Sequence, residues 1–373
     1  MTQVSQLQQL LQELRQQPVV AVDTESDSLF AYRYKVCLIQ LSVPQADYLV
    51  DPLALCDATP LGALFANPTV QKVFHAAEND IIALQRDYGF VFANIFDTLW
   101  AARILGWPNR NLAAILEARF GVGMNKRMQR ANWGRRPLTP EQLAYARLDS
   151  HYLLPLREIQ IAELTARGRM AEAAEAFARL TAVEWEEKPF DPDGFWRMNG
   201  VRELAPRALA VLRELYLWRE ERAQQLDRPL FKVVGDRTLL QLAEEQPADR
   251  QALRQVPGMS DYQVKRHGQG ILAAIARGQQ ASIPHLPAPQ RNNSARYLDA
   301  VAQARYDALR AWRNATAAER GVDPDVVLSN EELKAIALQA PKTLQQLAKI
   351  EALGPWKRAT YGKELLGVLA SSL

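Results

Sequence analysis

Hydrophobic residues recur at two different spacings along the 373-residue chain, and the pattern changes about halfway. Short runs of β-branched and aromatic residues between turn residues predict strands over residues 19–22, 36–41, 48–50 and 70–75. Hydrophobic residues at helical spacing predict helices over residues 5–14, 81–88, 98–105, 112–120, 141–156 and 158–180, the last two separated near Pro155. Hairpin-connected strands, followed by strands that alternate with helices, predict an α/β fold with a mixed sheet covered by helices.

Beyond about residue 185 the strand pattern ends, and two helical stretches match one another without a gap. Leu239 corresponds to Leu333, which sets the offset (333 − 239 = 94). The same offset pairs Trp218-Arg219 with Trp312-Arg313, Leu253 with Leu347, Gly268 with Gly362, and Asp236 with Asn330. Because residues of several types match at the same offset, the sequence predicts two copies of one helical module. Both tryptophans are expected in the cores of these modules. Asp236 and Asn330 are expected to be helix N-caps.

Two segments predict boundaries between domains. Residues 186–194 contain two prolines and a glycine, and residues 282–290 contain three prolines, which stiffen a linker. We therefore predict three domains, over residues 1–185, 205–282 and 292–373.

The composition narrows the class of protein only modestly. With 48% hydrophobic and 23% charged residues the chain is an ordinary globular mixture, and no apolar run is long enough to span a membrane. The start, Met1-Thr2-Gln3, begins no secretory signal pattern, so we expect a cytoplasmic protein without a membrane partner. Cys37 and Cys56 are the two cysteines, too few for a disulfide framework or a zinc cluster. A net charge of +3 permits a polyanionic partner without requiring one.

The first candidate chemistry is a pair of carboxylates, Asp23 and Glu25, at the end of the first predicted strand. Residues i and i+2 of a strand share a face, so these two like charges project together. Burying them is costly unless a divalent cation binds between them. An Asp-x-Glu sequence is common, however, and the pair also fits an ordinary loop after a strand.

Two further segments strengthen the metal hypothesis. Asp80 follows a predicted strand and opens a helix, where the helix dipole favours a carboxylate. Tyr145 and Asp149 are four residues apart and therefore share one face of a predicted helix. Taken singly, helix capping explains Asp80, and a polar helix edge explains the other two residues.

The combined order of Asp-x-Glu, Asp80 and Tyr-x-x-x-Asp resembles the tyrosine-bearing branch of the DEDD exonuclease superfamily. Residues 38–42, 74–76, 96–98 and 133–138 resemble ribonuclease D, and the helical modules resemble the HRDC domains that follow its nuclease domain. Ala76 stands where proofreading relatives carry Asn, which favours the ribonuclease D branch. The resemblance implies a ribonuclease H-like α/β nuclease domain, followed by two all-α HRDC-like domains.

The same resemblance implies a 3′-to-5′ exoribonuclease that uses two divalent metal ions, Mg²⁺ or Mn²⁺, and releases nucleoside 5′-monophosphates. Its partner would be RNA with a free 3′ end, with transfer RNA precursors as the implied substrate. By this analogy Asp23 bridges both ions, Glu25 and Asp149 hold the ion that binds the attacking water, and Asp80 holds the second. Tyr145 would orient the water.

A path for RNA is suggested by a loop without acidic residues, over residues 124–136. Its basic side chains are expected to meet phosphates, and Trp133 either stacks on a base or packs in the core. His75 either lines the cleft or is a hydrogen-bonded structural residue. The predicted substrate-binding residues are Thr24, His75, Asn79, Lys126, Arg127, Trp133 and Arg136. In the first helical module Lys265, Arg266 and His267 form a basic cluster for RNA, although a charge run is more often a solvated face.

Two alternatives remain open from the residues. A DNA exonuclease of the same superfamily differs only in sugar recognition, which depends on pocket geometry. A non-catalytic RNA-binding scaffold would keep the fold, but all five catalytic positions are occupied, which favours an enzyme. A phosphate-binding G-x-x-x-x-G-K-[ST] loop does not occur, so no nucleotide cofactor and no helicase fragment are expected.

Overall fold

The computed structural model describes residues 1–55, 57–285 and 298–371, and the chain divides into two compact units. Cys56 and the second half of the predicted proline linker lie outside the described residues. The first unit comprises residues 1–25 and 36–185, which contain the sheet, together with the second helical module at residues 298–371. The second unit comprises residues 26–35 and the first helical module, within residues 186–285.

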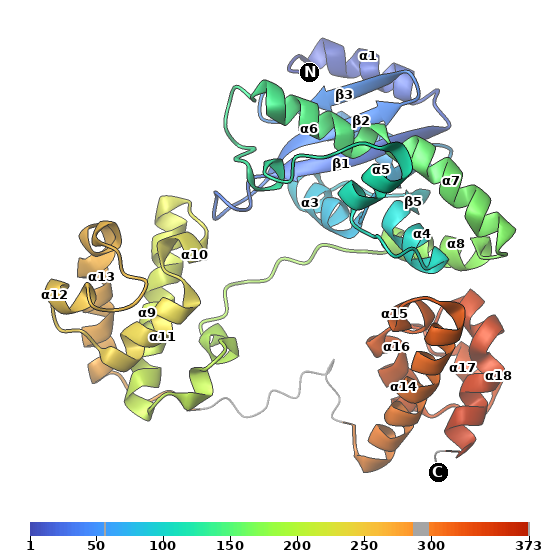
Figure 1. The fold of residues 1–373 in the computed structure, drawn as a ribbon. Coiled ribbons are helices and arrows are strands. Elements are labelled where there is room, and N and C mark those ends of the chain that lie inside the picture. Colours follow the sequence, from blue (N-terminus) through green and yellow to red (C-terminus); the bar gives the residue numbers. More distant parts are fainter. Residues whose placement is uncertain (56, 286–297, 372–373) are drawn as a thin grey trace. The chain divides into compact units, whose positions relative to one another are not determined.

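The sheet has five strands in the order β3-β2-β1-β4-β5 (Figure 1). Strands β2 and β3 form an antiparallel hairpin, whereas β1 pairs in parallel with β4, and β4 with β5. The predicted mixed sheet is therefore confirmed, and β5 adds a strand too short for the pattern to reveal. The strands are β1 (Val19–Ser26), β2 (Val36–Val43), β3 (Ala46–Val50), β4 (Gln71–Phe74) and β5 (Ile95–Asp97).

Helices cover both faces of this sheet (Figure 1). Successive residues of a strand point to opposite faces, so Val20 and Val22 of β1 join one hydrophobic core while Ala21 joins another. The first core includes residues of α1 and α3, and the second includes residues of α4, α7 and α8. The helices are α1 (Val4–Leu14), α2 (Gly62–Phe65), α3 (Glu78–Tyr88), α4 (Thr98–Leu105), α5 (Leu112–Phe120), α6 (Pro140–His151), α7 (Leu153–Ala166) and α8 (Met170–Thr181).

The predicted break near Pro155 is misplaced. The helices separate at Tyr152 and again around Gly168, which adopts a φ of 64°. Pro155 lies in the first turn of α7, where the backbone N–H that proline lacks would have no helical partner. Gly168 ends α7 because a left-handed conformation is easily accessible only to glycine.

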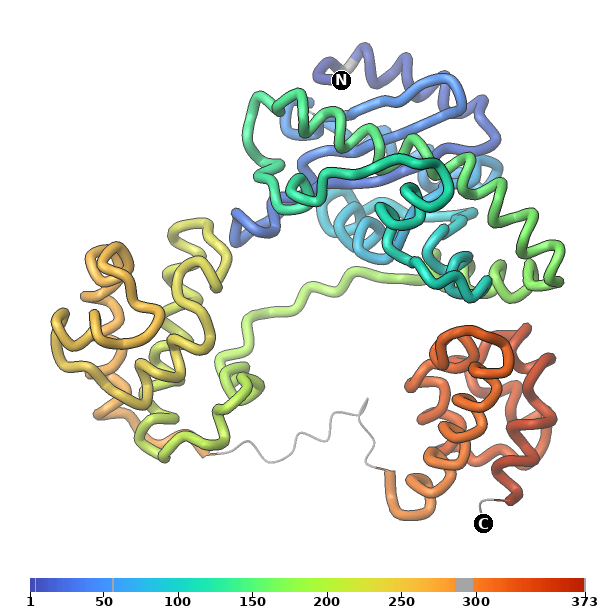
Figure 2. Tube along the Cα trace, in the orientation of Figure 1, coloured from blue at the N-terminus to red at the C-terminus, as the bar shows by residue number. Residues whose placement is uncertain are grey.

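The helices of the two modules correspond at the predicted offset, and Figure 2 traces each module as a cluster of helices. The two helical modules are therefore confirmed. The pairs are α9 (Pro206–Leu226) with α14 (Ala300–Arg320), α10 (Leu230–Val233) with α15 (Pro324–Val327), α11 (Asp236–Glu245) with α16 (Asn330–Gln339), α12 (Arg250–Leu253) with α17 (Leu344–Ala348), and α13 (Asp261–Gln280) with α18 (Pro355–Ser371). Within the described part of the chain, four short 3₁₀ turns occur at Thr59–Leu61, Met128–Arg130, Gly194–Arg197 and Val201–Glu203.

A buried arginine makes equivalent contacts in both modules. Arg219 Nη1 donates to the Val234 carbonyl (3.0 Å) and to Asp236 (2.6 Å). Arg313 Nη1 donates to the Leu328 carbonyl (3.1 Å) and to Asn330 (2.8 Å). The expectation that Asp236 and Asn330 are N-caps is wrong. Gly235 and Ser329 occupy those positions, because the longer polar side chains turn toward the arginine.

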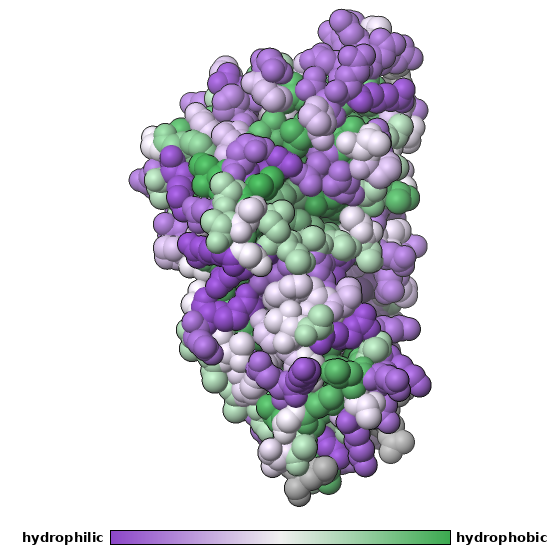
Figure 3. Space-filling view, turned by 90° about the vertical axis from the view of Figure 1, so that its right-hand side faces the viewer, coloured by the Kyte–Doolittle hydropathy of each residue, from purple (hydrophilic) through white to green (hydrophobic). Residues whose placement is uncertain are grey.

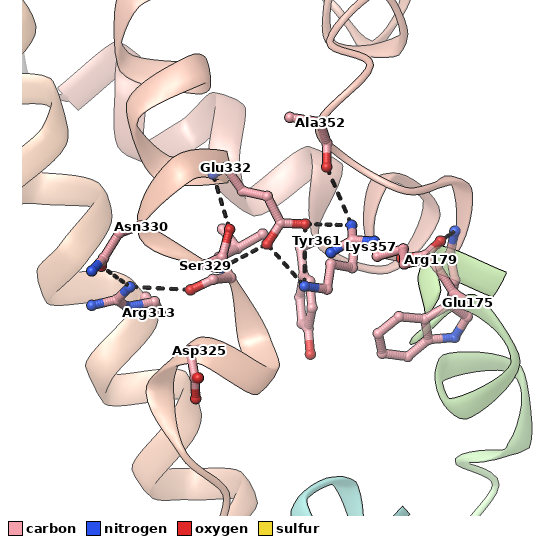
Figure 4. Close-up of polar contacts among 12 residues, drawn as sticks. Glu175, Arg179, Arg313, Asp325, Ser329, Asn330, Glu332, Ala352, Lys357 and Tyr361 are labelled. Atoms are coloured by element: carbon pink, nitrogen blue, oxygen red, sulfur yellow. Dashed lines mark hydrogen bonds and ion pairs between the residues drawn. The ribbon is translucent and has the colours of Figure 1, made fainter. Parts of the chain in front are cut away.

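Within the first unit, the second module contacts α8 through a network of ion pairs around the buried carboxylate of Glu332 (Figure 4). The carboxylate of Glu332 accepts hydrogen bonds from Lys357 Nζ (2.9 Å), from Arg179 of α8 and from the Ser329 backbone N–H (2.6 Å). Glu332 is 1% exposed and Lys357 7%. Nearby, Arg320 pairs with Glu172 of α8. Each buried charge is thus compensated by a partner from another helix.

On the face shown in Figure 3 hydrophilic side chains predominate, and the hydrophobic ones lie in scattered patches. Among the described residues, no helix is both long enough and apolar enough to cross a lipid bilayer.

Replacing Glu332 with Gln is expected to destabilise the protein, because the ammonium of Lys357 would stay buried without its carboxylate. Removing one member of a buried pair costs about 3–5 kcal/mol, so thermal unfolding should begin at a clearly lower temperature. The matched control is Glu331→Gln, an exposed neighbour on the same helix. Equal melting profiles for the two variants would contradict the stabilising role of the network.

Candidate metal centre

Parallel pairing of β1 with β4 brings the first three carboxylates to one edge of the sheet. Val19–Ala21 of β1 pair with Gln71–Val73 of β4, so the carboxyl ends of both strands lie on the same side. Asp23 and Glu25 follow the paired part of β1, and Asp80 lies in the first turn of α3, which follows β4. The hydroxyl of Thr24 donates a hydrogen bond to Asp80 Oδ1, which ties β1 to α3.

Helix α6 supplies the other two predicted residues, Tyr145 and Asp149. Thr139 and Gln142 form a capping box that fixes the start of α6. The helix packs on β2 and β3, and the buried hydroxyls of Ser150 and Ser42 lie 2.8 Å apart. Asp149 precedes this buried contact by one residue, so its position relative to the sheet is tightly set.

The structure brings together Asp23, Glu25 and Asp149, which are three of the four predicted metal ligands. One carboxylate oxygen of each lies within 4.8 Å of the others. Asp80 is close enough that its charge contributes to the raised pKa values of Asp23 and Glu25. Tyr145 and Asp149 are hydrogen-bonded to one another, and both are almost completely buried.

Burial and mutual repulsion both act against ionisation of the cluster. Burial, followed by the charges of Asp149 and Asp80, raises the pKa of Glu25 to about 9. Burial likewise raises the pKa of Asp149 to about 8 and that of Asp80 to about 7, and it raises the pKa of Asp23 well above its usual range. Carboxylates whose ionised form is this unfavourable are stabilised strongly by a bound cation.

The donor set fits a divalent metal ion. All of the clustered ligand atoms are carboxylate oxygens, which suit hard ions such as Mg²⁺ and Mn²⁺. Asp149 Oδ2 is buried and has no hydrogen-bond partner among the described residues, so it is available as a ligand. An arrangement of this kind can hold ions against a phosphate group.

Tyr145 is positioned as a neutral hydrogen-bonding group. Burial, followed by the charge of Asp149, raises the pKa of its hydroxyl, which therefore stays protonated at neutral pH. A hydrogen bond with Gln129 also reaches the hydroxyl, and the ring packs near Trp133 at 6.2 Å between centroids. Sequence reasoning missed Gln129, because nothing in a loop sequence indicates that it folds back onto α6.

Asp97 is a second residue whose role the sequence did not reveal. It ends β5 and is completely buried, and its carboxylate accepts hydrogen bonds from the backbone N–H groups of Leu99 (2.8 Å), Trp100 (2.9 Å) and Ala77 (2.7 Å). It therefore caps α4 and fixes the start of α3, the helix that carries Asp80. The Asp-Thr pair before a predicted helix is an N-cap signal, but the contact with Ala77 depends on tertiary structure.

Three of the predicted substrate-binding residues are exposed: Asn79 on α3, and Lys126 and Arg127 in the loop before α6. Their predicted contacts with RNA stay predictions. Thr24 is engaged with Asp80, which places it beside the carboxylates.

The other three make structural contacts. Trp133 is 1% exposed and packs with Cys37, Leu38 and Tyr145, which corresponds to the core alternative. Arg136 donates two hydrogen bonds of 2.6 Å to Asp51 and others to backbone carbonyls, so its guanidinium is already engaged. His75 Nδ1 lies 2.9 Å from the hydroxyl of Thr98, and burial lowers its pKa to about 4. Tertiary packing thus gives each of these side chains structural contacts, and their contacts with RNA stay predictions.

Comparison with known families adds independent information. Residues 1–163 match the 3′-5′ exonuclease family, and residues 208–275 and 302–369 each match the HRDC domain family. Ribonuclease D of Gluconacetobacter diazotrophicus is 32% identical over 373 residues, covering 98% of this chain and 91% of that protein. Ribonuclease D of Granulibacter bethesdensis is 30% identical over the same shares of both chains.

Solved structures agree. The crystal structure of Escherichia coli RNase D, an exoribonuclease involved in structured RNA processing, matches with a TM-score of 0.68 and 25% identity, covering 100% of this chain and 98% of that one. The catalytic core of RRP6 from Trypanosoma brucei matches with a TM-score of 0.66 and 26% identity, covering 74% of this chain and 78% of that one.

The raised pKa values predict how stability depends on pH when metal is removed. In the folded chain these carboxyls keep their protons up to about pH 8 or 9, whereas in the unfolded chain they lose them near pH 4. The folded state therefore loses stability relative to the unfolded state as pH rises toward about 9. In EDTA the melting temperature should therefore fall between about pH 6 and pH 9, and excess Mg²⁺ or Mn²⁺ should restore it by favouring the ionised form. Asp149→Asn, which removes one carboxylate, should flatten the decline in EDTA. A metal-free melting temperature that rises over this range would contradict the electrostatic account.

Proposed function

Because this chain belongs to the ribonuclease D family of 3′-to-5′ exoribonucleases, we propose that it hydrolyses RNA with two divalent metal ions, Mg²⁺ or Mn²⁺, and releases nucleoside 5′-monophosphates. The observation that carries the proposal is the convergence of Asp23, Glu25 and Asp149 within 4.8 Å, from two elements far apart in the sequence. Asp80 completes the set from a third element.

Each carboxylate has a proposed role. Asp23 would serve as a ligand for both ions, Glu25 and Asp149 would hold the ion that binds the attacking water, and Asp80 would hold the other. Asp80 accepts a hydrogen bond from Thr24, which suits a ligand that acts through an intervening water. When bound, the ions lower the pKa of water and neutralise negative charge that develops on the phosphate.

The remaining steps depend on the chain's own side chains. The hydroxyl of Tyr145 stays protonated and orients the water for in-line attack on the terminal phosphodiester. The 3′ oxygen of the preceding nucleotide leaves, and the released nucleotide keeps its 5′ phosphate. Gln129 and Asp149 hold the tyrosine hydroxyl in place. Asp97 fixes α3 and thereby the position of Asp80.

The proposed substrate is RNA with a free 3′ end, in particular transfer RNA precursors, encountered in the cytoplasm. Among solved structures, the similar Escherichia coli RNase D is an exoribonuclease involved in structured RNA processing, which supports this substrate class. Asn79, Lys126 and Arg127 are exposed and are proposed to contact the strand. The domain limits 1–185, 205–282 and 292–373 are likewise part of the proposal.

Hydrolysis should require Asp149 and a divalent ion. With 3′- and 5′-labelled RNA and Mg²⁺ or Mn²⁺, the protein is expected to release mononucleotides from the 3′ end, and Asp149→Asn should slow release by more than about a hundredfold. Glu141→Gln, an exposed change on the same helix, is the control and should retain activity. Endonucleolytic products, activity in EDTA, or faster cleavage of matched DNA would each overturn part of the proposal.

Tyr145→Phe removes the hydroxyl but keeps the ring that packs near Trp133, so the variant should fold. We expect the rate of nucleotide release to fall about 10- to 100-fold, because the water loses its orienting group. Single-turnover kinetics at saturating protein measure this step. Tyr152→Phe, just beyond the end of α6, is the matched control. An unchanged rate in Tyr145→Phe would remove the tyrosine from the mechanism.

A further inference from the structure

The two helical modules differ in what lies beside one tryptophan, and in the first module this tryptophan borders a cavity. In the second module the indole N–H of Trp312 donates a hydrogen bond of 2.9 Å to the carboxylate of Glu364. At the offset of 94 residues the first module has Trp218 and Gly270 (312 − 218 = 94 and 364 − 270 = 94). Gly270 carries no side chain, so the indole N–H of Trp218 has no acceptor within the described residues.

Gly270 lies directly against this indole. A Cβ added to Gly270 would be 2.4 Å from Trp218 Nε1, so the indole lies where a side chain of residue 270 would begin. Trp218 and Gly270 border an open cavity of about 370 Å³, which is also lined by Arg222, Gln225, Arg266, His267 and Gln269, among others. The first module therefore has a cavity beside this tryptophan and no carboxylate at the residue that corresponds to Glu364.

The lining of the cavity is rich in hydrogen-bond donors. Arg222 donates to the neutral side chain of Gln225 (3.2 Å), and Arg266 to the hydroxyl of Tyr262 (3.0 Å). Neither guanidinium forms an ion pair within the described part of the chain. One carboxylate, that of Glu221, also borders the cavity, and it accepts a hydrogen bond from Gln225 (3.0 Å).

The two arginines of the first module have neutral counterparts in the second. Arg222 corresponds to Thr316 and Arg266 to Thr360, while Gly270 corresponds to Glu364. Two arginines and a glycine in one copy thus correspond to two threonines and a carboxylate in the other, while Glu221 of the first copy corresponds to Ala315 of the second. Such a reversal is expected if the first copy receives an anion from outside the chain.

His267, which also lines the cavity, adds no positive charge to it. It is 5% exposed, and its Nδ1 has no hydrogen-bond partner among the described residues. Burial, followed by the charges of Arg222 and Arg266, lowers its pKa to about 4. The imidazole is therefore neutral at physiological pH and leaves the two arginines as the sources of positive charge.

We propose that this cavity of the first module binds a phosphate group of an RNA strand, through the guanidinium groups of Arg222 and Arg266 and the indole N–H of Trp218. In the second module the carboxylate of Glu364 accepts the corresponding indole N–H, that of Trp312. Guanidinium groups bind phosphate oxygens with paired hydrogen bonds, which favours a phosphate over a neutral ligand. The choice of RNA rests on the proposed function of the chain.

The main test compares full-length variants for binding of a fluorescein-labelled stem-loop RNA with a single-stranded 3′ tail, in EDTA to prevent hydrolysis. Arg222→Gln with Arg266→Gln should weaken binding about tenfold and lower the slope of log Kd against log salt concentration by about 1. The control, Arg228→Gln with Arg237→Gln, removes the same two charges from exposed positions of the same module outside the cavity. Equal slopes and equal losses of affinity in both double variants would overturn the proposal.

Gly270→Glu places a carboxylate beside the two arginines and is expected to weaken RNA binding at least as much. Gly270→Ala adds the Cβ without the charge and should weaken it less, which separates repulsion from crowding against Trp218. If both Gly270 variants unfold, the arginine variants still decide the question.

A direct readout is the indole N–H signal of Trp218 in full-length protein with its eight tryptophans ¹⁵N-labelled, identified with Trp218→Phe. The signal should shift on addition of the RNA, and should not shift in the double arginine variant. A shift with inorganic phosphate or poly-glutamate but not with RNA would overturn RNA as the ligand. Failure of the proposed function appears separately, as wild-type protein that releases no mononucleotides from labelled RNA.

Discussion

Repulsion among four carboxylates is the constraint on which the rest of the first unit depends. Asp23, Glu25, Asp80 and Asp149 lie close together in a largely buried place, and their raised pKa values measure how unfavourable their joint ionisation is. A flexible framework would let them move apart. Instead β1 is anchored between two hydrophobic cores, and buried Asp97 fixes the start of α3. The cluster therefore keeps its geometry. A divalent ion would bind strongly there, because its charge offsets the repulsion between the carboxylates.

The two helical modules show how one fold supports different roles. Both keep the same helices and the same buried arginine, Arg219 or Arg313, with matching backbone contacts. In the second module Glu332 and Lys357 join Arg179 of α8, so its charges are paired within the unit (Figure 4). In the first module the residue corresponding to Glu332 is Thr238. Its arginines beside Trp218 remain available for a ligand, because the fold is already maintained by the shared core.

Residues whose roles depend on local chain geometry were predictable. The strand alternation that joins Asp23 to Glu25 and the helical spacing that joins Tyr145 to Asp149 are properties of neighbouring residues. The helices over Thr98–Leu105 and Leu112–Phe120 begin and end where the pattern predicts. Trp133 was left open between RNA and the core, and Arg136 was predicted to contact RNA, because a basic aromatic loop has the same composition whether it faces RNA or packs inward. Their burial and their contacts with Tyr145 and Asp51 depend on where the loop folds.

The sequence by itself determined the order of the carboxylates, the α/β nuclease fold and the duplication of the helical module, since each is a pattern of periodicity or spacing along one chain. Tertiary structure alone decided which carboxylates meet, because Asp149 reaches Asp23 only when α6 packs on β2 and β3. It also decided that the indole N–H of Trp312 meets Glu364, whereas the indole of Trp218 packs against Gly270 beside a cavity. The sequence alone does not show what the exchange of Glu for Gly does between the modules. Its effect on an indole N–H depends on which atoms packing places within hydrogen-bond distance.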